Sequence, residues 1–452
     1  MHFDAADIAR SRSHPGEGSR LRRAMTKLLQ GKPISALVLG GSIEQGGDLN
    51  TRMDAYFAQV TDWINATFPP IEGQHTFHNG GRSSTGSPYF ASCLHDHVPD
   101  KNVDLVFLQF DVNDGVRTPY MNNAHRRALE VLIRKLLNLP ASPALVYMHW
   151  WSPTTNQGQR SFWNHTVQPE SGLLAAYYGL PSVSMRDVWY HHWARNEPGF
   201  LSRDVMCSIN HPNYLGHLYV ADLLIALLQD HLAAAALLPA DDAVAEHELP
   251  EPMLPGNHES GAGSVCLHDD SLRDALVPGS ASGFQFVDDT TSYGTHRWGW
   301  VSEAPGDSME MQVDTRNPAE TDGGSWLSMA VLMSYKDRGA AKLECVRECA
   351  CNPMTIDSLW KAKLSIKEWW HIRVSASEQC VVRLTSTPTG REGGSRFKVE
   401  AFTVRPQSTG DNEEGIAGNV TAAGSEWAHN YEASRAGHYA TAGAWRNKGS
   451  GQ

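Results

Sequence analysis

The sequence predicts a parallel α/β domain followed by an all-β sandwich. In the first half of the 452 residues, strand-like and helix-like segments alternate, which is the pattern of a parallel sheet covered on both faces. The second half contains short strand-like runs separated by Gly, Asp and Asn, as in an all-β domain. A chain of this length also exceeds the usual size of a single hydrophobic core.

The elements of the first domain follow from hydrophobic patterning. Runs of β-forming residues predict strands over 34–40, 75–79, 104–110, 144–151 and 181–185. Apolar residues at three- and four-residue steps predict helices over 50–68, 122–138 and 212–230. Ligand sites in parallel sheets lie beyond the carboxyl ends of the strands. Polar residues just past those ends, among them Ser42, Asn79 and Asn113, are therefore candidate functional groups.

Composition sets the remaining boundaries. A stretch rich in Pro, Glu and Gly reads as a linker, and the last residues have the Gly, Ala, Ser and Asn content of a disordered segment. The expected organisation is a helical or irregular lead-in over 1–33, the α/β domain over 34–238, the linker over 239–262, the β-sandwich over 263–405 and a disordered tail over 406–452.

Charge and hydropathy restrict the partners. The chain has 38 Lys plus Arg against 50 Asp plus Glu, a net charge of −12, without a basic stripe. This balance argues against nucleic-acid binding, which needs clustered positive charge. The most apolar segment, 218–238, contains Asp222, Asp230 and His231, so we expect a core helix rather than a membrane span. No signal peptide is visible at the N-terminus.

Seven cysteines leave two interpretations open. Cys345, Cys349, Cys351 and Cys380 cluster near the end of the β domain and predict either disulfides or a metal site. The Cys-x-Cys step fits common zinc spacings poorly, so disulfides are favoured. Disulfides indicate a secreted protein or one in the secretory lumen, whereas the lack of a visible signal peptide leaves a cytoplasmic location open. The odd total leaves at least one thiol free or bonded to another chain.

Four segments of the first half form an ordered set. They are "VLGGSIEQG" with Ser42, "HNGGRSSTGSPYFASC", "DLVFLQFDVND" with Asn113, and "SINHPNYLGH" with His211. This set resembles the four blocks of the SGNH hydrolases (GDSL-type esterases) over about 34–230. It is most similar to SGNH-like proteins of algae and other eukaryotes that have a β-rich C-terminal region. The resemblance implies a flavodoxin-like three-layer fold and an esterase that needs neither metal nor cofactor.

The resemblance also assigns roles to residues. Ser42 would be the nucleophile and His211 the base that takes its proton, since a serine hydroxyl is a poor nucleophile until deprotonated. The oxyanion formed on the substrate needs fixed donors. These would be the N–H of Ser42, the Asn113 amide and a second-block N–H, for which the candidates are Gly80, Gly81 and Ser84.

Three positions depart from the family pattern. Ser208 stands where an aspartate normally precedes the histidine by three residues. The partner of the His211 imidazole could then be Ser208 itself, a backbone carbonyl, or Asp204. Ser84 replaces the second-block glycine, and Glu44 stands where threonine is usual.

Three functions are compatible with these residues. The leading hypothesis is a serine ester hydrolase that removes acetyl or other acyl groups from a carbohydrate or another small ester. One alternative is a carbohydrate O-acyltransferase, in which a sugar hydroxyl replaces water. The other is a weak or inactive SGNH-like domain that serves as a glycan-binding or structural protein, as the three departures would allow.

Overall fold

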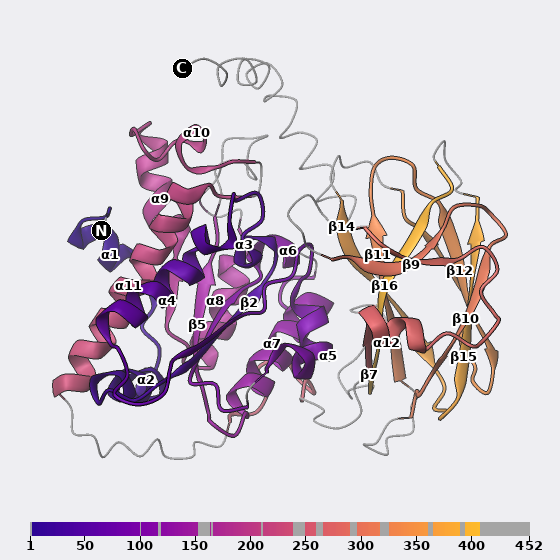
Figure 1. Ribbon diagram of the computed structural model, residues 1–452, viewed down its shortest axis with the longest axis horizontal. Helices are drawn as coiled ribbons and strands as arrows, with labels where there is room; N and C mark the ends of the chain where they lie inside the picture. Colours follow the sequence, from indigo (N-terminus) through magenta and orange to yellow (C-terminus); the bar gives the residue numbers. More distant parts are fainter. Residues whose placement is uncertain are drawn as a thin grey trace.

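The computed structural model of the chain contains an α/β domain and a β domain that lie side by side (Figure 1). It describes residues 2–99, 101–115, 119–151, 163, 166–208, 211–237, 249–258, 265–289, 296–316, 325–359, 365–388 and 394–406. The tail expected to be disordered, over 406–452, lies outside the described residues except for Pro406.

The α/β domain is built on a six-stranded sheet in the order β1-β6-β5-β4-β2-β3. Its strands are β1 (Arg12–His14), β2 (Ser35–Gly40), β3 (Thr76–Asn79), β4 (Leu105–Gln109), β5 (Ala144–His149) and β6 (Ser182–Ser184). Strands β2 to β6 are parallel, and β1 pairs antiparallel with β6 at the edge. The five predicted strands and the parallel flavodoxin-like sheet are confirmed. The sheet also extends by β1 into the segment expected as a lead-in.

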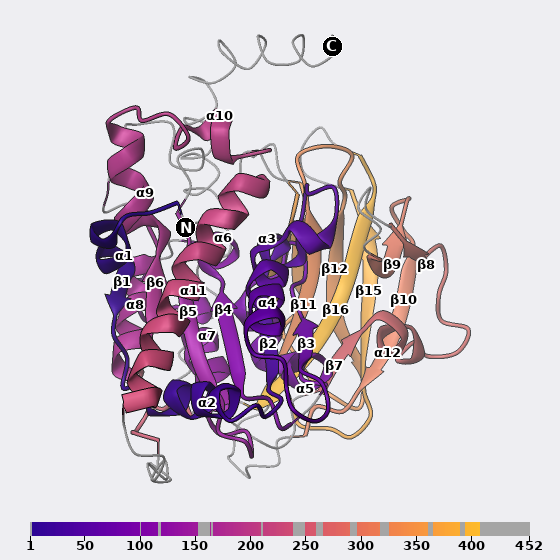
Figure 2. The same ribbon diagram turned by 60° about the vertical axis from the view of Figure 1, so that its left-hand side comes forward.

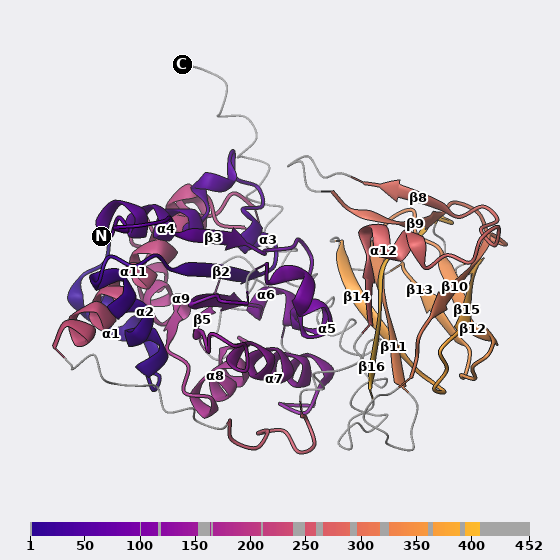
Figure 3. The same cartoon turned by 60° about the horizontal axis from the view of Figure 1, so that its bottom comes forward.

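Helices cover both faces of this sheet. Strands β4 and β5 are therefore buried along their whole length, and they are apolar on both sides except for Gln109 and His149 at their ends. Figure 3 shows α4 and α11 on one side and α7 and α8 on the other. The first face carries α2 (Ser19–Leu29), α4 (Tyr56–Thr67) and α11 (Tyr214–Leu237), with α1 (Ala5–Ser11) and α9 (Met185–Ala194) beside them. The second face carries α5 (Ser87–His97), α7 (Ala124–Leu137) and α8 (Gln168–Tyr177).

Helix α11 has the length and apolar composition that a membrane crossing would require. In the structure it packs against α2 and α4, and Val220, Leu224 and Leu228 on it are fully buried in the core. This is the packing expected from the charged residues in its sequence.

Four short helical segments complete the α/β domain: α3 (Ser42–Gln45), η1 (Arg52–Asp54), α6 (Asp111–Asp114) and α10 (Ser202–Val205). Helix α3 begins directly after β2, and α6 begins soon after β4. Both therefore lie at the carboxyl edge of the sheet, where they appear close together in Figure 1.

The β domain is a sandwich of two antiparallel sheets, as predicted. We call the sheet with strand order β14-β11-β16-β9-β8, in which β7 also pairs with β16, the inner sheet, and the sheet β10-β15-β12-β13 the outer sheet. Apolar residues of both sheets form the core between them. The elements are β7 (Val265–His268), α12 (Asp269–Asp274), β8 (Gln285–Asp288), β9 (Trp298–Ser302), β10 (Ser308–Val313), β11 (Ser325–Met333), β12 (Ala340–Arg347), β13 (Met354–Asp357), β14 (Ile366–Val374), β15 (Cys380–Thr387) and β16 (Phe397–Pro406).

The inner sheet lies between the outer sheet and the α/β domain (Figure 3), and the two domains also lie side by side in the view of Figure 2. The face of the inner sheet that is turned toward the α/β domain contributes Ala330, Trp369 and Ala401 to the same apolar cluster as α5 and α7. All nine residues of β11 are consequently buried. A large apolar contact, rather than the linker alone, therefore holds the two domains together.

Polar contacts and one disulfide surround this apolar contact. Cys93 of α5 is bonded to Cys266 of β7. The Arg82 guanidinium donates to both carboxylate oxygens of Asp269 at 3.1 Å, and the His268 Nε2 lies 2.9 Å from Asp96 Oδ2. These bonds tie the second sequence block directly to the β domain.

The described part of the connecting segment, 249–258, runs along α7. Glu130 of α7 accepts hydrogen bonds from the backbone N–H groups of Met253 and Leu254 and from the Asn257 amide. Leu254 and Asn257 are buried. This part of the predicted linker is therefore packed against the α/β domain.

The clustered cysteines form disulfides, as favoured from their spacing. The bonds join Cys345 to Cys351 and Cys349 to Cys380. Together with Cys93–Cys266 they use six of the seven cysteines, and Cys207 is the free thiol.

Candidate active site

Ser42 stands at a break that only glycines allow. A Cβ on Gly40 would come within 2.6 Å of the Gln109 carbonyl oxygen, and one on Gly41 within 2.2 Å of Asn113 Oδ1. Both glycines are needed for this close approach. The chain leaves β2, turns at once and begins α3 with Ser42, whose side chain is partly exposed.

His211 faces this hydroxyl from the segment before α11. Its Nε2 lies 2.7 Å from Ser42 Oγ. Asn213 fixes the segment, because its N–H donates to the Val205 carbonyl at 2.9 Å and its amide to the Asp204 carbonyl at 2.8 Å. The nucleophile–base pair inferred from two separate motifs is thus assembled at hydrogen-bond distance.

The acid that completes the arrangement is Asp48. Its Oδ2 lies 2.6 Å from His211 Nδ1. The chain reaches this position by a turn after α3, in which Gly46 has φ +84° and Asp48 has φ +64°, a region that aspartate tolerates better than most residues. A Cβ on Gly47 would come within 3.5 Å of His211 Cε1 and 3.0 Å of the Ser42 carbonyl oxygen. The two glycines thus let the carboxylate return to the imidazole.

The two side chains considered for this role from the sequence lie differently. Ser208 Oγ is 3.2 Å from His211 Nδ1, a second and longer contact. Asp204 is turned to its own helix start, where its Oδ2 accepts the N–H groups of Gly199 at 2.9 Å and Leu201 at 3.2 Å. Asp48 was not predicted, because the family pattern places the acid three residues before the histidine, at the position of Ser208. The "GGD" that follows α3 was the available signal.

The second block leaves one of its three candidate oxyanion donors open. The Gly80 N–H donates to the Val38 carbonyl and the Gly81 N–H to Asn79 Oδ1, each at 2.9 Å. Within the described part of the chain, the N–H of Ser84 has no such acceptor. Ser84 has φ +58°, the left-handed conformation that glycine adopts most easily. The serine therefore keeps the backbone shape expected of the glycine it replaces.

Asn113 is held over the nucleophile turn by its neighbours in α6. Asp111 accepts the Tyr147 hydroxyl at 2.9 Å, and Asp114 accepts the Ser87 N–H at 2.8 Å and its hydroxyl at 2.6 Å. The Asn113 side chain then lies against Gly41, beside Ser42. Its amide makes no hydrogen bond within the described residues, so no described group uses its two donors.

Asp114 remains a charged anchor for this helix. Burial alone would raise its pKa, but hydrogen bonds from His125 and Ser87 and the nearby Arg126 charge together hold the pKa below its ordinary value. The side chain is fully buried and accepts three donors. This anchor joins the second and third sequence blocks.

Glu44 points into the core and supports the turn from that side. Its carboxyl accepts the Gly41 N–H at 2.8 Å, the Tyr56 hydroxyl at 3.1 Å and the Gln109 amide at 3.3 Å. Burial raises the pKa of Glu44 to about 8, although these hydrogen bonds oppose the rise. The carboxyl that replaces the usual threonine is therefore buried in the core and stabilises the turn that carries Ser42.

Metal ligation has little support in the described residues. Two groups bring three potential ligand atoms together: Cys345, Cys349 and Cys380, and Asp96, Cys266 and His268. Every cysteine in both groups is part of a disulfide. Such sulfurs are not thiolates and do not supply the ligands that a metal needs.

The fold is shared with solved esterase structures. A two-domain esterase active on acetylated mannans, solved alone and co-crystallised with mannopentaose, is similar over 89% of this chain with a TM-score of 0.65 and 21% identity. The match covers 98% and 99% of that chain in the two structures. An acetyl xylan esterase is similar over 43% of this chain and 98% of its own, with a TM-score of 0.35 and 18% identity.

The likeness to the two-domain esterase shows that the chain shares its fold, an α/β domain with an additional β domain. No protein-family model matches the chain, and no curated protein matches it in sequence. The closer similarity to algal proteins stays a prediction.

Proposed function

We propose that this protein is a serine ester hydrolase that removes acetyl or other acyl groups from carbohydrate. One observation carries the proposal: Ser42 Oγ, His211 and Asp48 form a continuous hydrogen-bonded chain, with 2.7 Å between oxygen and Nε2 and 2.6 Å between Nδ1 and carboxylate. This is the arrangement of a Ser-His-Asp triad, which is recognised by geometry rather than by sequence position.

In the first half of the reaction, Ser42 Oγ attacks the ester carbonyl carbon and its proton passes to His211 Nε2. Asp48 accepts the Nδ1–H and stabilises the imidazolium that forms. The oxyanion is stabilised by the N–H of Ser42, the N–H of Ser84 and the Asn113 amide. The carbon–oxygen bond then breaks, and the sugar hydroxyl leaves with the proton from Nε2.

In the second half, water attacks the acyl-serine and gives a proton to His211 Nε2. Collapse of the second tetrahedral intermediate breaks the bond to Ser42 Oγ. The carboxylic acid is released, and Ser42 regains its proton from His211. No metal or cofactor takes part in any step, since the residues supply the nucleophile, base and oxyanion donors.

The three sequence departures that favoured an inactive protein have local explanations. Asp48 supplies the carboxylate missing at Ser208. Ser84 keeps a left-handed backbone, and Glu44 is buried away from solvent. An acyltransferase would share the acyl-serine and differ only in its acceptor, so the products distinguish the two reactions.

The substrate class rests on the similar solved structures. We infer an acetylated polysaccharide, since the similar two-domain esterase is active on acetylated mannans. The three disulfides support a secreted or secretory-lumen location. Such a location would give the enzyme access to extracellular polysaccharide.

The test uses the full chain and measures acetate released from acetylated mannan oligosaccharides and p-nitrophenol released from p-nitrophenyl acetate. Wild type should act on both and react with a fluorophosphonate probe. Ser42→Ala should lose both properties, whereas the control Ser13→Ala in β1 should keep them. Labelling that persists in Ser42→Ala would overturn the proposal. Transfer of acetyl to added sugar in preference to water would identify an acyltransferase.

A further inference from the structure

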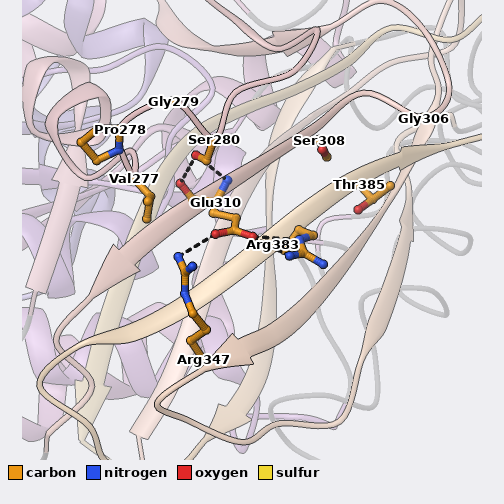
Figure 4. A pocket seen from close by; sticks show the side chains of 10 residues that line it. All are labelled: Val277, Pro278, Gly279, Ser280, Gly306, Ser308, Glu310, Arg347, Arg383 and Thr385. Atoms are coloured by element: carbon orange, nitrogen blue, oxygen red, sulfur yellow. Dashed lines mark hydrogen bonds and ion pairs between the residues drawn. The ribbon is translucent and has the colours of Figure 1, made fainter.

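The outer sheet of the β domain carries a polar pocket that the proposed esterase reaction does not use. It has a volume of about 510 Å³ and is lined by residues 277–280, the turn at Gly306 and strands β10, β12 and β15. Figure 4 shows Glu310 between Arg347 and Arg383, with Ser280, Ser308 and Thr385 around them. The volume falls in the range of ordinary small-ligand sites.

Strand alternation places these side chains on one surface. Ser308 pairs with Thr385 and Glu310 with Arg383 in the register of β10 and β15. The intervening Met309 is buried in the sandwich core. Because alternate residues of a strand face opposite sides of a sheet, the polar residues form a row on the solvent side.

The wall at 277–280 is fixed rather than loose. The Val277 N–H donates to the Glu310 carbonyl at 2.9 Å. The Ser280 hydroxyl bonds both backbone groups of Glu310 at 3.1 Å. A Cβ on Gly279 or Gly306 would meet nothing within 4 Å, so the glycines leave the rim open. The pocket is therefore preformed on one side and open on the other.

The charges in the pocket sum to one positive unit. Glu310 Oε2 lies 2.7 Å from Arg347 Nη2, and Oε1 lies 2.5 Å from Arg383 Nη2. The Glu310 side chain is 14% exposed, against 53% and 44% for the two arginines. Each guanidinium has five N–H donors, and Glu310 occupies only one or two of them. The remaining donors are available to a ligand, in a chain whose net charge is −12.

We propose that this pocket binds an anionic saccharide, with a carboxylate or sulfate group at Arg347 and Arg383. A guanidinium can bind two oxygens of either group with two parallel hydrogen bonds. The hydroxyls of Ser308 and Thr385 can donate to or accept from ring hydroxyls, and the Ser280 oxygen can accept one further hydrogen bond. A lone inorganic anion would leave most of the pocket empty, whereas a sugar ring bearing the anion fills it.

This site goes beyond the proposed function because it is a second binding site, separate from Ser42. The inner sheet lies between the outer sheet and the α/β domain (Figure 1). A saccharide in the pocket would consequently not present its ester to the nucleophile. It would attach the enzyme to an acidic polysaccharide that carries or accompanies the acetylated substrate.

The test uses the full chain with Ser42→Ala, so that no ligand is hydrolysed, and calorimetric titration with three tetrasaccharides: an oligogalacturonide, a sulfated oligosaccharide and neutral mannotetraose. We expect binding of one or both acidic ligands, weakened by salt, and no binding of the neutral one. Whichever acidic ligand binds identifies the group. Binding of the neutral ligand alone, or of none, would overturn the proposal.

Variants then locate the site. Arg347→Gln and Arg383→Gln, made singly so that Glu310 keeps one partner, should each weaken binding of the acidic ligand by about tenfold, the loss of one charge-assisted hydrogen bond. The control is Arg316→Gln, an exposed arginine paired with Asp314 outside the pocket. Equal affinity in all three variants would refute the assignment.

A separate measurement keeps this result independent of the esterase proposal. With Ser42 restored, both pocket variants should hydrolyse p-nitrophenyl acetate at the wild-type rate. Loss of that activity would show general damage and count against a separate site. An inactive wild type would refute the esterase and leave the binding result unaffected.

Discussion

Replacing Asp48 with asparagine tests the least expected part of the site. The variant keeps the size of the side chain and removes the charge that faces His211 Nδ1 at 2.6 Å. Its amide can also donate to Nδ1, which would leave the proton on Nε2, where it blocks the base. Asp48 contacts Nδ1 of the imidazole, whereas Ser42 lies at Nε2 on the opposite side of the ring. Asp48 is therefore separated from the reacting serine by the imidazole, and we expect the substitution to lower kcat with little change in KM.

The magnitude follows from the interaction that the transition state gains. A carboxylate and an imidazolium with their charges about 4 Å apart attract by about 4 kcal/mol at an effective dielectric constant of about 20. This corresponds to a rate factor of about 10³. The wrong tautomer can raise the loss toward about 10⁴, as in a serine protease triad. Because about a fifth of each side chain is exposed, 20% for Asp48 and 21% for His211, we expect a fall in kcat of about 10³.

The assay is steady-state hydrolysis of p-nitrophenyl acetate. The control is Asp54→Asn, a carboxylate in the adjacent η1 segment, which should keep the wild-type rate. Ser208→Asp added to Asp48→Asn should recover part of the loss, since Ser208 Oγ already lies 3.2 Å from Nδ1. A kcat for Asp48→Asn within tenfold of wild type would refute the role assigned to this residue.

Three further predictions concern the supports of the site. In the folded state the pKa of Glu44 is about 8, above its ordinary value of 4.5. Between these two pH values the folded state therefore binds more protons than the unfolded state. The free energy of unfolding should consequently fall as the pH rises from 4.5 to 8, by at most about 5 kcal/mol. Urea denaturation at pH 5 and pH 8 should show a smaller difference for Glu44→Gln than for wild type, and equal differences would contradict this. Asp269→Asn should lower kcat about fivefold, equivalent to about 1 kcal/mol, because Arg82 then holds the second-block loop less firmly. The control is Asp270→Asn, a substitution of the exposed neighbouring residue. Equal kcat values in the two variants would exclude the effect. Ser84→Gly should leave kcat within about twofold and stabilise the protein by about 1 kcal/mol by relieving a left-handed serine; a lower melting temperature or a large loss of kcat would show that the serine side chain is needed.

The parallel sheet was predictable because its strands are buried on both faces. Such strands read as continuous apolar runs, as in "LVFLQ" of β4. Strand β1 was not predictable, since it has three residues, Arg12 to His14, and no apolar alternation. Helix α5 was also missed: much of its surface faces the β domain as well as the sheet, so buried residues such as Ser87 and Ser92 break the one-sided pattern.

The parts of the candidate site that could be predicted are those for which a sequence motif specifies both the residue type and the local backbone conformation. Ser42 and His211 follow from their segments, and their separation of 169 residues is closed by the sheet. The position of Asp48 depends on a left-handed turn and on where the segment before α11 lies, neither of which is written in a local pattern. The alternatives left open by the sequence were Ser208, a backbone carbonyl and Asp204, and coordinates were needed to find Asp48 beside His211.

The inner sheet, covered on both sides, makes the two domains unsuitable as separable modules. A chain shortened to the α/β domain would expose the apolar surface of α5 and α7 that Ala330, Trp369 and Ala401 now cover, and patches of that kind promote aggregation. A substitution that enlarges a side chain at this contact in one domain has to be accompanied by a smaller side chain at the facing position of the other domain. Exchange of the β domain for an unrelated one would therefore disrupt this contact before it could change what the protein binds.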